Sequence, residues 1–383
     1  MYKYLIICLL TYPTLLRSQE KLSYQKVDSL TYQYFLKGQW KELIDFSQKA
    51  EKQEINFKYL HQRLGYAYFM KSDYFAAEHQ YEQAFDFDHF DPVTLEYLYY
   101  CRLYTGSEEC SRYFARNLDV QTLKQLHVSK ITPVDQVEAE YNYKTNDAIT
   151  RSDPSYYRIG IKTLLGYQLS LTQSVSYFGQ TIDAESVKQP EYYALLRWQP
   201  TSKIQIKGAF HGINTKIGIY NYPAYMGFLG VSSQLSRFNI EGNVSVLKLD
   251  TSTVQQFGIQ AGVVLPGRSN LYFTGTLNAM SESSSTRAVY SQSAGLRCYK
   301  NLWAEANVTM GNLRNYSTLD ALYVYNTIDP TVFRTGLTIF YQLNQHITLI
   351  GNFTYDQKEF NSSLINHQHY NQLSISGGIK WKL

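Results

Sequence analysis

The chain has 383 residues, a formal net charge of +4 and only 18% charged residues. This length suffices for two domains with cores of their own, and the charge is too small to favour a nucleic-acid partner. Tyrosine is abundant, with 36 residues beside 19 Phe and 4 Trp. Tyrosine is favoured where one end of the side chain is apolar and the other is wet. The composition therefore fits a Tyr-rich β-protein or a membrane protein.

The N-terminus reads MYKYLIICLLTYPTLLRSQEK, in which Lys3 precedes an apolar run from Tyr4 to Leu16. This run is too short to span a bilayer as a helix, and it has the length of a signal-peptide core. We therefore expect residues 1–18 to be a signal peptide that is cleaved before Gln19, and the mature chain to be exported.

Export leaves three cysteines in the mature chain, at positions 101, 110 and 298. An oxidising compartment permits a disulfide, and Cys101 and Cys110 flank the short turn YTGSEE. The two residues form either a disulfide or two small buried side chains of a helical hairpin. No cysteine or histidine spacing fits a metal site, so we expect no metal and no cofactor.

Residues 57–92, FKYLHQRLGYAYFMKSDYFAAEHQYEQAFDFDHFDP, have helical periodicity. The pattern of two helices and a closing proline is carried by Leu64, Gly65, Tyr68, Ala77, Tyr81, Ala84 and Pro92. It resembles the tetratricopeptide repeat (TPR), whose period of about 34 residues also finds degenerate copies on either side. We expect three helical hairpins over residues 24–120 and a linker over 121–134. The resemblance implies either a periplasmic protein partner or a brace for the next domain.

From about residue 135 the periodicity changes to two, which is typical of β-strands. We count about 14 strands in residues 135–383, or 12 if weak strands near 190 and 290 are absent, each of roughly transmembrane length. Short connections alternate with long ones, which we expect at 144–155, 179–190, 212–223, 281–287, 312–330 and 357–369. This layout is typical of an outer-membrane barrel.

The apolar face of nearly every strand is free of charge, which favours contact with lipid over the core of a soluble sandwich. The polar face then lines a lumen. Strand parity assigns to this lumen the bases Arg158, Lys162, Arg197, Lys203, Lys207, Arg297, Arg334 and Lys380 and the acids Glu138, Glu140, Glu241 and Glu305. An excess of positive charge favours anionic solutes. The alternative is a set of Arg–Glu pairs that fills and rigidifies a narrow barrel.

The chain ends in SISGGIKWKL, an alternating strand that continues to the last residue. Its apolar face consists of Leu373, Ile375, Ile379, Trp381 and Leu383. Chain ends usually fray, so this pattern indicates a strand that closes the barrel against the first one. The ending resembles the terminal strand of bacterial outer-membrane proteins, which insertion machinery recognises, with leucine in place of the usual final phenylalanine.

The segments LGYAY, AAEHQYEQAF and LSISGGIKWKL, behind a signal peptide, together resemble the YaiO-like outer-membrane β-barrel proteins. Some of those proteins carry TPRs ahead of the barrel. The resemblance implies a Gram-negative outer membrane, with the barrel in its lipid bilayer, the helical domain in the periplasm and the insertion machinery as a partner. The same order of domains also resembles exopolysaccharide exporters, which have longer repeat arrays.

The expected fold class is an α+β two-domain protein, with TPR-like α-helical hairpins before an antiparallel transmembrane β-barrel. We expect a porin-like transport channel or an envelope assembly scaffold; the alternatives are an exopolysaccharide-export component and a surface barrel enzyme. Catalysis would depend on His367, His369, Asp356 and Glu359 in the last long connection. No phosphate-binding loop, zinc motif or Gly-x-Ser-x-Gly elbow accompanies them, so we expect the protein not to be an enzyme.

Overall fold

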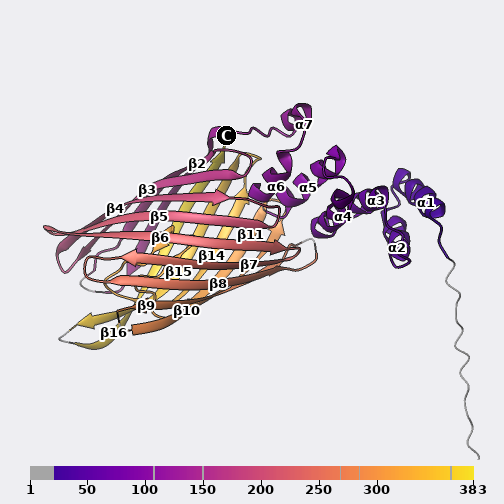
Figure 1. The fold of residues 1–383 in the computed structure, drawn as a ribbon. Coiled ribbons are helices and arrows are strands. Elements are labelled where there is room, and N and C mark those ends of the chain that lie inside the picture. Colours follow the sequence, from indigo (N-terminus) through magenta and orange to yellow (C-terminus); the bar gives the residue numbers. More distant parts are fainter. Residues whose placement is uncertain (1–20, 107, 149–150, 268, 284, 363–364) are drawn as a thin grey trace, which may run out of the picture.

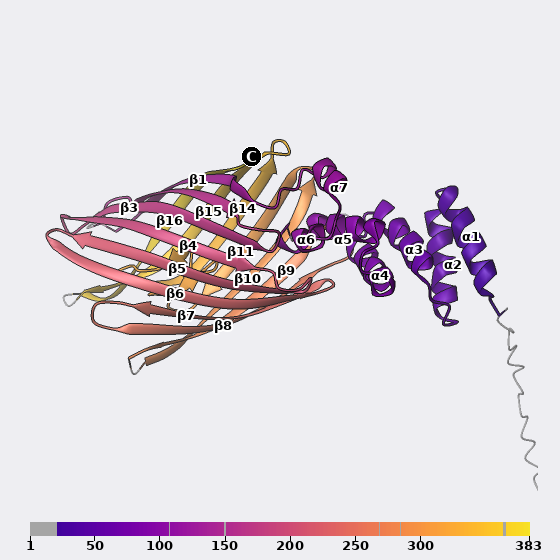
Figure 2. The ribbon, with the colours of Figure 1, turned by 45° about the horizontal axis from the view of Figure 1, so that its top comes forward.

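The computed structural model describes residues 21–106, 108–148, 151–267, 269–283, 285–362 and 365–383. The predicted signal peptide, residues 1–18, lies outside this part of the chain. A row of helices extends from one end of a closed β-barrel (Figure 1). A second view shows α6 and α7 beside the barrel and α1 farthest from it (Figure 2). The predicted fold class is confirmed.

The helical region holds seven helices in the described residues. They are α1 (Tyr24–Leu36), α2 (Trp40–Glu51), α3 (Lys58–Met70), α4 (Tyr74–Phe87), α5 (Pro92–Tyr104), α6 (Glu108–Ala115) and α7 (Val120–Gln125). The first six form three consecutive hairpins, as predicted, and α7 occupies the start of the expected linker. None of the described helices is both long and apolar enough to cross a bilayer.

Short polar residues determine where the helices of the central hairpin and its successor begin. Asp73 accepts a hydrogen bond from the backbone N–H of Ala76 at the start of α4, at 3.1 Å. Asp91 does the same for Thr94 at the start of α5, at 2.9 Å. Pro92 is the first residue of α5, where no partner for a backbone N–H is needed.

Helices α3 and α4 cross at Gly65, which packs against the ring of Tyr81. A Cβ atom added at Gly65 would lie 2.9 Å from two carbons of this ring, and Tyr81 is only 1% exposed. The same ring stacks on Tyr97 of α5, with centroids 5.0 Å apart. The seven signature residues thus lie on α3 (Leu64, Gly65, Tyr68), on α4 (Ala77, Tyr81, Ala84) and at the start of α5 (Pro92).

The third hairpin contains a buried ion pair and two buried cysteines. Arg102, 1% exposed, pairs with Glu78 of α4. Cys101 and Cys110 are thiols in the structure and lie in α5 and α6. Burial raises the pKa of Cys101 well above its ordinary range, so its reactive thiolate form is scarce. The disulfide between the two cysteines stays a prediction.

The barrel consists of 14 antiparallel strands, and β1 pairs with both β2 and β16. The strands are β1 (Thr132–Asn146), β2 (Ser155–Leu164), β3 (Leu169–Ile182), β4 (Glu185–Trp198), β5 (Ile204–Ile217), β6 (Tyr220–Leu235), β7 (Phe238–Lys248), β8 (Thr253–Val264), β9 (Tyr272–Glu282), β10 (Ser285–Tyr299), β11 (Leu302–Met310), β14 (Thr331–Gln342), β15 (Ile347–Ser362) and β16 (Ile365–Lys382). A separate hairpin, β12 (Ser317–Thr318) with β13 (Tyr323–Val324), interrupts the series between β11 and β14.

The last strand closes the barrel. β16 pairs with β1 from Gln136↔Lys382 to Asn146↔Gln372. Its apolar residues face outward, since Ile375 is 65% exposed, while its polar residues face inward, since Ser374 is 2% exposed. This ordered closure explains why the alternation continues to the end of the chain.

The connections at the end of the barrel away from the helices are shorter than expected. Strand β3 ends at Ile182 and β4 begins at Glu185, so the connection predicted at 179–190 is a tight hairpin. Its two turn residues, Asp183 and Ala184, have positive φ, which matches the twist of the flanking strands. The connections predicted at 212–223, 281–287 and 357–369 are likewise mostly strand. Long connections remain at 147–154 and 311–330.

We predict that Gly65→Ala lowers the free energy of unfolding of the helical region by about 1–2 kcal/mol. Alanine gains up to about 1 kcal/mol in helix propensity, but its Cβ overlaps the buried Tyr81 ring, and overpacking costs about 1–3 kcal/mol. Hydrogen exchange of α3 and α4 in the detergent-solubilised protein measures the change. The double variant Gly65→Ala with Tyr81→Leu should lose less free energy of unfolding than the two single variants lose together. Losses that add exactly would contradict the contact between the two residues.

Candidate functional site

The connection between β11 and β14, residues 311–330, folds into the lumen; we call it the lumenal loop. Its tip is held by Asp320, whose carboxylate lies 2.7 Å from Lys207 Nζ and 3.2 Å from Arg197 Nη2. The hydroxyl of Tyr193 donates to the backbone oxygen of Asp320 at 2.9 Å. These partners are on β4 and β5, which do not neighbour β11 or β14. The loop therefore crosses the interior of the barrel.

Both flanks of the loop tip also contact the barrel wall, one at β5 and the other at β1. Nδ1 of His211, on β5, lies 2.9 Å from the backbone oxygen of Ala321. The hydroxyl of Tyr323 donates to Glu140 of β1 at 2.6 Å. The small β12–β13 hairpin is thus connected to walls on different sides of the barrel.

The end of the lumenal loop is anchored by Asp329. One of its carboxylate oxygens accepts hydrogen bonds from Arg151 Nε at 3.1 Å and from the Tyr370 hydroxyl at 2.9 Å. Arg151 lies in the connection before β2 and also pairs with Asp183, at 2.8 Å. Asp329 thereby joins the loop to β16 and to the far rim.

An apolar core fills the lumen beside β5 to β10. Its wall residues, each at most 9% exposed, are Ile213, Ala224, Met226, Phe228, Leu247, Val254, Met280 and Val289. The lumenal loop adds Leu313, Tyr316 and Ala321 to this core. The expectation of a polar inner face is wrong on this side of the barrel, because the loop gives inward apolar side chains a partner other than water.

The residues predicted as lumenal charges are mostly held in ion pairs. Arg158 lies 3.0 Å from Glu138 and 3.1 Å from Glu140. The remaining pairs are Lys162–Glu108 (3.1 Å), Lys203–Glu82 (3.1 Å), Lys207–Glu241 (2.6 Å), Arg334–Asp356 (2.9 Å) and Lys380–Glu138 (3.6 Å), in addition to Arg197–Asp320. Glu305 accepts a hydrogen bond from Tyr272, and the guanidinium of Arg297 lies 5.8 Å from the ring centre of Trp303.

Several of these partners were not in the predicted set. The carboxylates of Glu108, Asp320 and Asp356 each neutralise a predicted lumenal cation. Lys144 and Lys358 are further inward cations, on β1 and β15. Their strand parity would have identified them, but both positions were assigned to long connections.

The helical region is attached to the other end of the barrel by ion pairs. The carboxylate of Glu108, at the start of α6, lies 3.1 Å from Lys162 Nζ and also binds the ammonium group of Lys382 in the last strand. The neighbouring Glu109 lies 3.2 Å from Lys162. Burial alone would raise the pKa of Glu108, but the two ammonium groups lower it to about 2. Glu108 is therefore ionised at any physiological pH.

A second contact joins the helices to the turn between β6 and β7. The guanidinium of Arg237 lies 2.6 Å from Asp73 and 5.0 Å from the ring centre of Phe75. The barrel rim thus binds the N-terminal end of α4 as well as that of α6. Together with the Lys203–Glu82 pair, these contacts attach the helical region to the barrel at three places and restrict its rotation.

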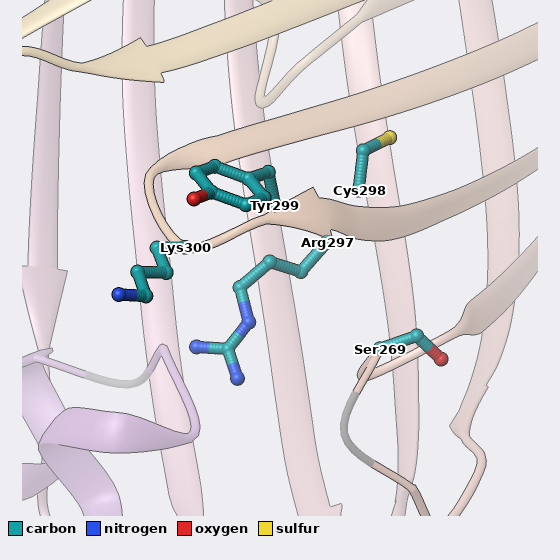
Figure 3. Close-up of a pocket in the computed structure, with 5 residues that line it drawn as sticks. All are labelled: Ser269, Arg297, Cys298, Tyr299 and Lys300. Atoms are coloured by element: carbon teal, nitrogen blue, oxygen red, sulfur yellow. The ribbon is translucent and has the colours of Figure 1, made fainter.

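A groove of about 500 Å³ lies at the helical end of β10 and β11 (Figure 3). It is lined by Ser269, Arg297, Cys298, Tyr299 and Lys300. Arg297 and Lys300 extend to the same side, and Cys298 points elsewhere. Among the described residues that line it there is no carboxylate or histidine.

The residues considered for catalysis do not form one site. Asp356 is buried on the inner face of β15 and binds Arg334. His369 is exposed on β16, opposite Glu359 in the strand register. The side chain of His367 lies outside the described residues. No group of three His, Cys, Asp or Glu side chains in the described part of the chain could hold a metal ion.

Comparison with protein-family models and with curated proteins finds no match. Among solved structures, 301 chains match. They include a bacterial polysaccharide outer membrane secretin (8% identity, 66% of this chain and 99% of that one, TM-score 0.41). They also include the CymD monoaromatic hydrocarbon channel (9% identity, 66% of this chain and 89% of that one, TM-score 0.44). A third is the outer membrane protein Omp33 of Acinetobacter baumannii (12% identity, 66% of this chain and 99% of that one, TM-score 0.39). At these identities the likeness concerns the barrel alone. Its closed ladder and apolar outer face are those of an outer-membrane β-barrel.

We predict that Glu108→Gln weakens docking of the helical region on the barrel by about 1 kcal/mol. Because the folded pKa of Glu108 is lowered, its contribution is present above the ordinary pKa of about 4.5 and is lost as pH falls toward 2. Hydrogen exchange of α6 in the full-length protein should be constant from pH 8 to 5, after correction for intrinsic exchange rates. The variant should exchange faster throughout this range.

The matched control is Glu42→Gln, which removes an exposed carboxylate of α2. It should leave exchange of α6 unchanged. Equal exchange of α6 in the Glu108 variant and the unaltered protein would contradict the docking role of this carboxylate.

Proposed function

We propose that the protein is a gated transport channel of the bacterial outer membrane, with its helical region in the periplasm. The orientation is supported by the two long connections, 147–154 and 311–330, at the end away from the helices, since outer-membrane barrels carry their longer loops on the extracellular side. The predicted signal peptide of residues 1–18 accounts for export. A YaiO-like identity and a TPR-type partner-binding role for residues 24–120 belong to the same proposal, supported by the three helical hairpins and the Gly65–Tyr81 crossing.

The single observation that supports gating is the ionic hold on the tip of the lumenal loop. Asp320 is held by Lys207 and Arg197, and neither contact is part of the strand ladder. The loop can therefore leave its position without breaking a hydrogen bond between barrel strands. In the structure the loop occupies part of the lumen and contacts β1, β4 and β5.

A second function, a sealed barrel that acts as an assembly scaffold, is favoured by the apolar core. Leu313 and Tyr316 of the loop are at most 4% exposed, and full burial of an apolar side chain stabilises by about 1.5–3 kcal/mol. A loop held this way could be a permanent plug, which would leave the helical region as the functional part of the protein.

We predict that Asp320→Ala raises the open probability of the barrel in planar bilayers by about tenfold or more. The substitution leaves Arg197 without its carboxylate and removes one of the two carboxylates at Lys207; breaking a buried pair typically costs about 3–5 kcal/mol. The control Asp250→Asn changes an exposed carboxylate in the turn after β7 and should leave conductance unchanged. A heat-dependent gel shift verifies that each barrel is folded.

Replacing residues 314–327 by a short Gly-Ser linker decides between the two functions. A channel then conducts continuously, with larger currents than the Asp320 variant. A folded barrel that stays silent after this deletion would contradict transport and leave the scaffold.

A further inference from the structure

A second groove, of about 730 Å³, lies where the helical region meets the outer wall of the barrel; we call it the rim groove. Its floor includes Leu169 of β3 and Leu196 and Trp198 of β4. Leu196 is 42% and Trp198 48% exposed, and the register places Leu169 opposite Trp198. Because Arg197, between the two β4 residues, points inward to Asp320, the floor belongs to the outer, lipid-facing wall.

The helical region supplies two cations to the edge of this groove, Arg116 just after α6 and Lys130 just before β1. Arg116 is held in place by Tyr113: its Nη2 donates to the Tyr113 hydroxyl at 3.0 Å, and the guanidinium lies 4.0 Å from the ring centre. Within the described residues no carboxylate lies within ion-pairing distance of Arg116 or Lys130. The groove lining itself contains no acidic residue.

The groove thus combines an uncompensated pair of cations with an apolar floor that continues into the membrane-facing surface. Tyr167, also in the lining, and Trp198 lie at the helical end of the strands, where aromatic side chains mark the level of lipid headgroups. A molecule that matches the two cations, the apolar floor and the aromatic residues at headgroup level has an anionic head and acyl chains. Basic pockets at the membrane boundary bind lipid headgroups in this way.

We propose that the rim groove binds an anionic phospholipid of the periplasmic leaflet, with its phosphate at Arg116 and Lys130 and its acyl chains along Leu169, Leu196 and Trp198. This inference rests on the proposed placement of the helical end on the periplasmic side. Arg116 follows α6 directly, and α6 carries the Glu108 contact to the rim. The bound lipid therefore adds a further attachment between the helical region and the barrel.

The test is native mass spectrometry of the full-length protein in detergent, with phosphatidylglycerol or phosphatidylcholine added at equal concentration. We expect the unaltered protein to retain phosphatidylglycerol about tenfold better, since each nearby Lys or Arg contributes severalfold to the binding of an anionic lipid. The double variant Arg116→Gln with Lys130→Gln should lose this preference. Trp198→Ala should lower retention of both lipids, because it removes part of the floor.

The matched control neutralises two exposed cations of the helical region outside the groove, Lys37→Gln with Lys71→Gln, and should keep the preference. The proposal is overturned if the unaltered protein does not distinguish the two lipids, or if the control loses the preference equally. Displacement of the lipid by millimolar inorganic phosphate would also overturn it, since it would indicate a site for a free anion.

A protease added to intact cells tests the placement separately. Cleavage of the helical region there would contradict the periplasmic placement, whereas the lipid preference in detergent depends on the groove alone. Neither measurement reads conductance, so failure of the channel proposal is distinguishable from failure of the lipid site.

Discussion

The rest of the structure depends on one constraint, the need to pair every backbone amide that lies in hydrocarbon. An unpaired peptide group there costs several kcal/mol, so the sheet must close, and β16 must pair with β1 along its length. Closure determines which side of each strand meets lipid, and hence the alternation from Thr132 to the end of the chain. The outward exposure of Ile375 and the inward burial of Ser374, its neighbour on β16, both follow from this closure.

Closure of 14 strands also creates an interior too wide for wall side chains to fill, since about eight strands is the number at which they can. The lumenal loop fills part of this space and brings its own chemistry. Its apolar residues cover inward Met and Leu side chains, and Asp320 and Asp329 neutralise three cations, Arg197, Lys207 and Arg151. At the other end of the barrel, Glu108 neutralises Lys162 and Lys382. Ion pairs therefore join the barrel to both the lumenal loop and the helical region.

The sequence predicted the architecture well because periodicity reports local geometry. The change from helical to strand period near residue 135, the strand number and the closing role of the last strand could all be read from the pattern. Inside the lumen the prediction was weaker. Parity identified the direction of Arg158 and Arg334, but their partners depend on register and on a loop that folds inward. Polar residues such as Asp320 and Asp329 look the same in a solvated loop and in a lumenal one, so no local signal separates the two cases.

The carboxylate of Glu108 binds Lys382, one residue from the end of the chain. The helices form mainly local contacts and can fold as soon as they are synthesised, whereas pairing of residue 136 with residue 382 requires the whole chain. Glu108 consequently meets Lys382 only after β16 has paired with β1, although Lys162 of β2 is available to it earlier. This contact therefore forms only in a closed barrel, whereas the contacts of Glu108 with Lys162 and of Asp73 with Arg237 involve earlier parts of the barrel.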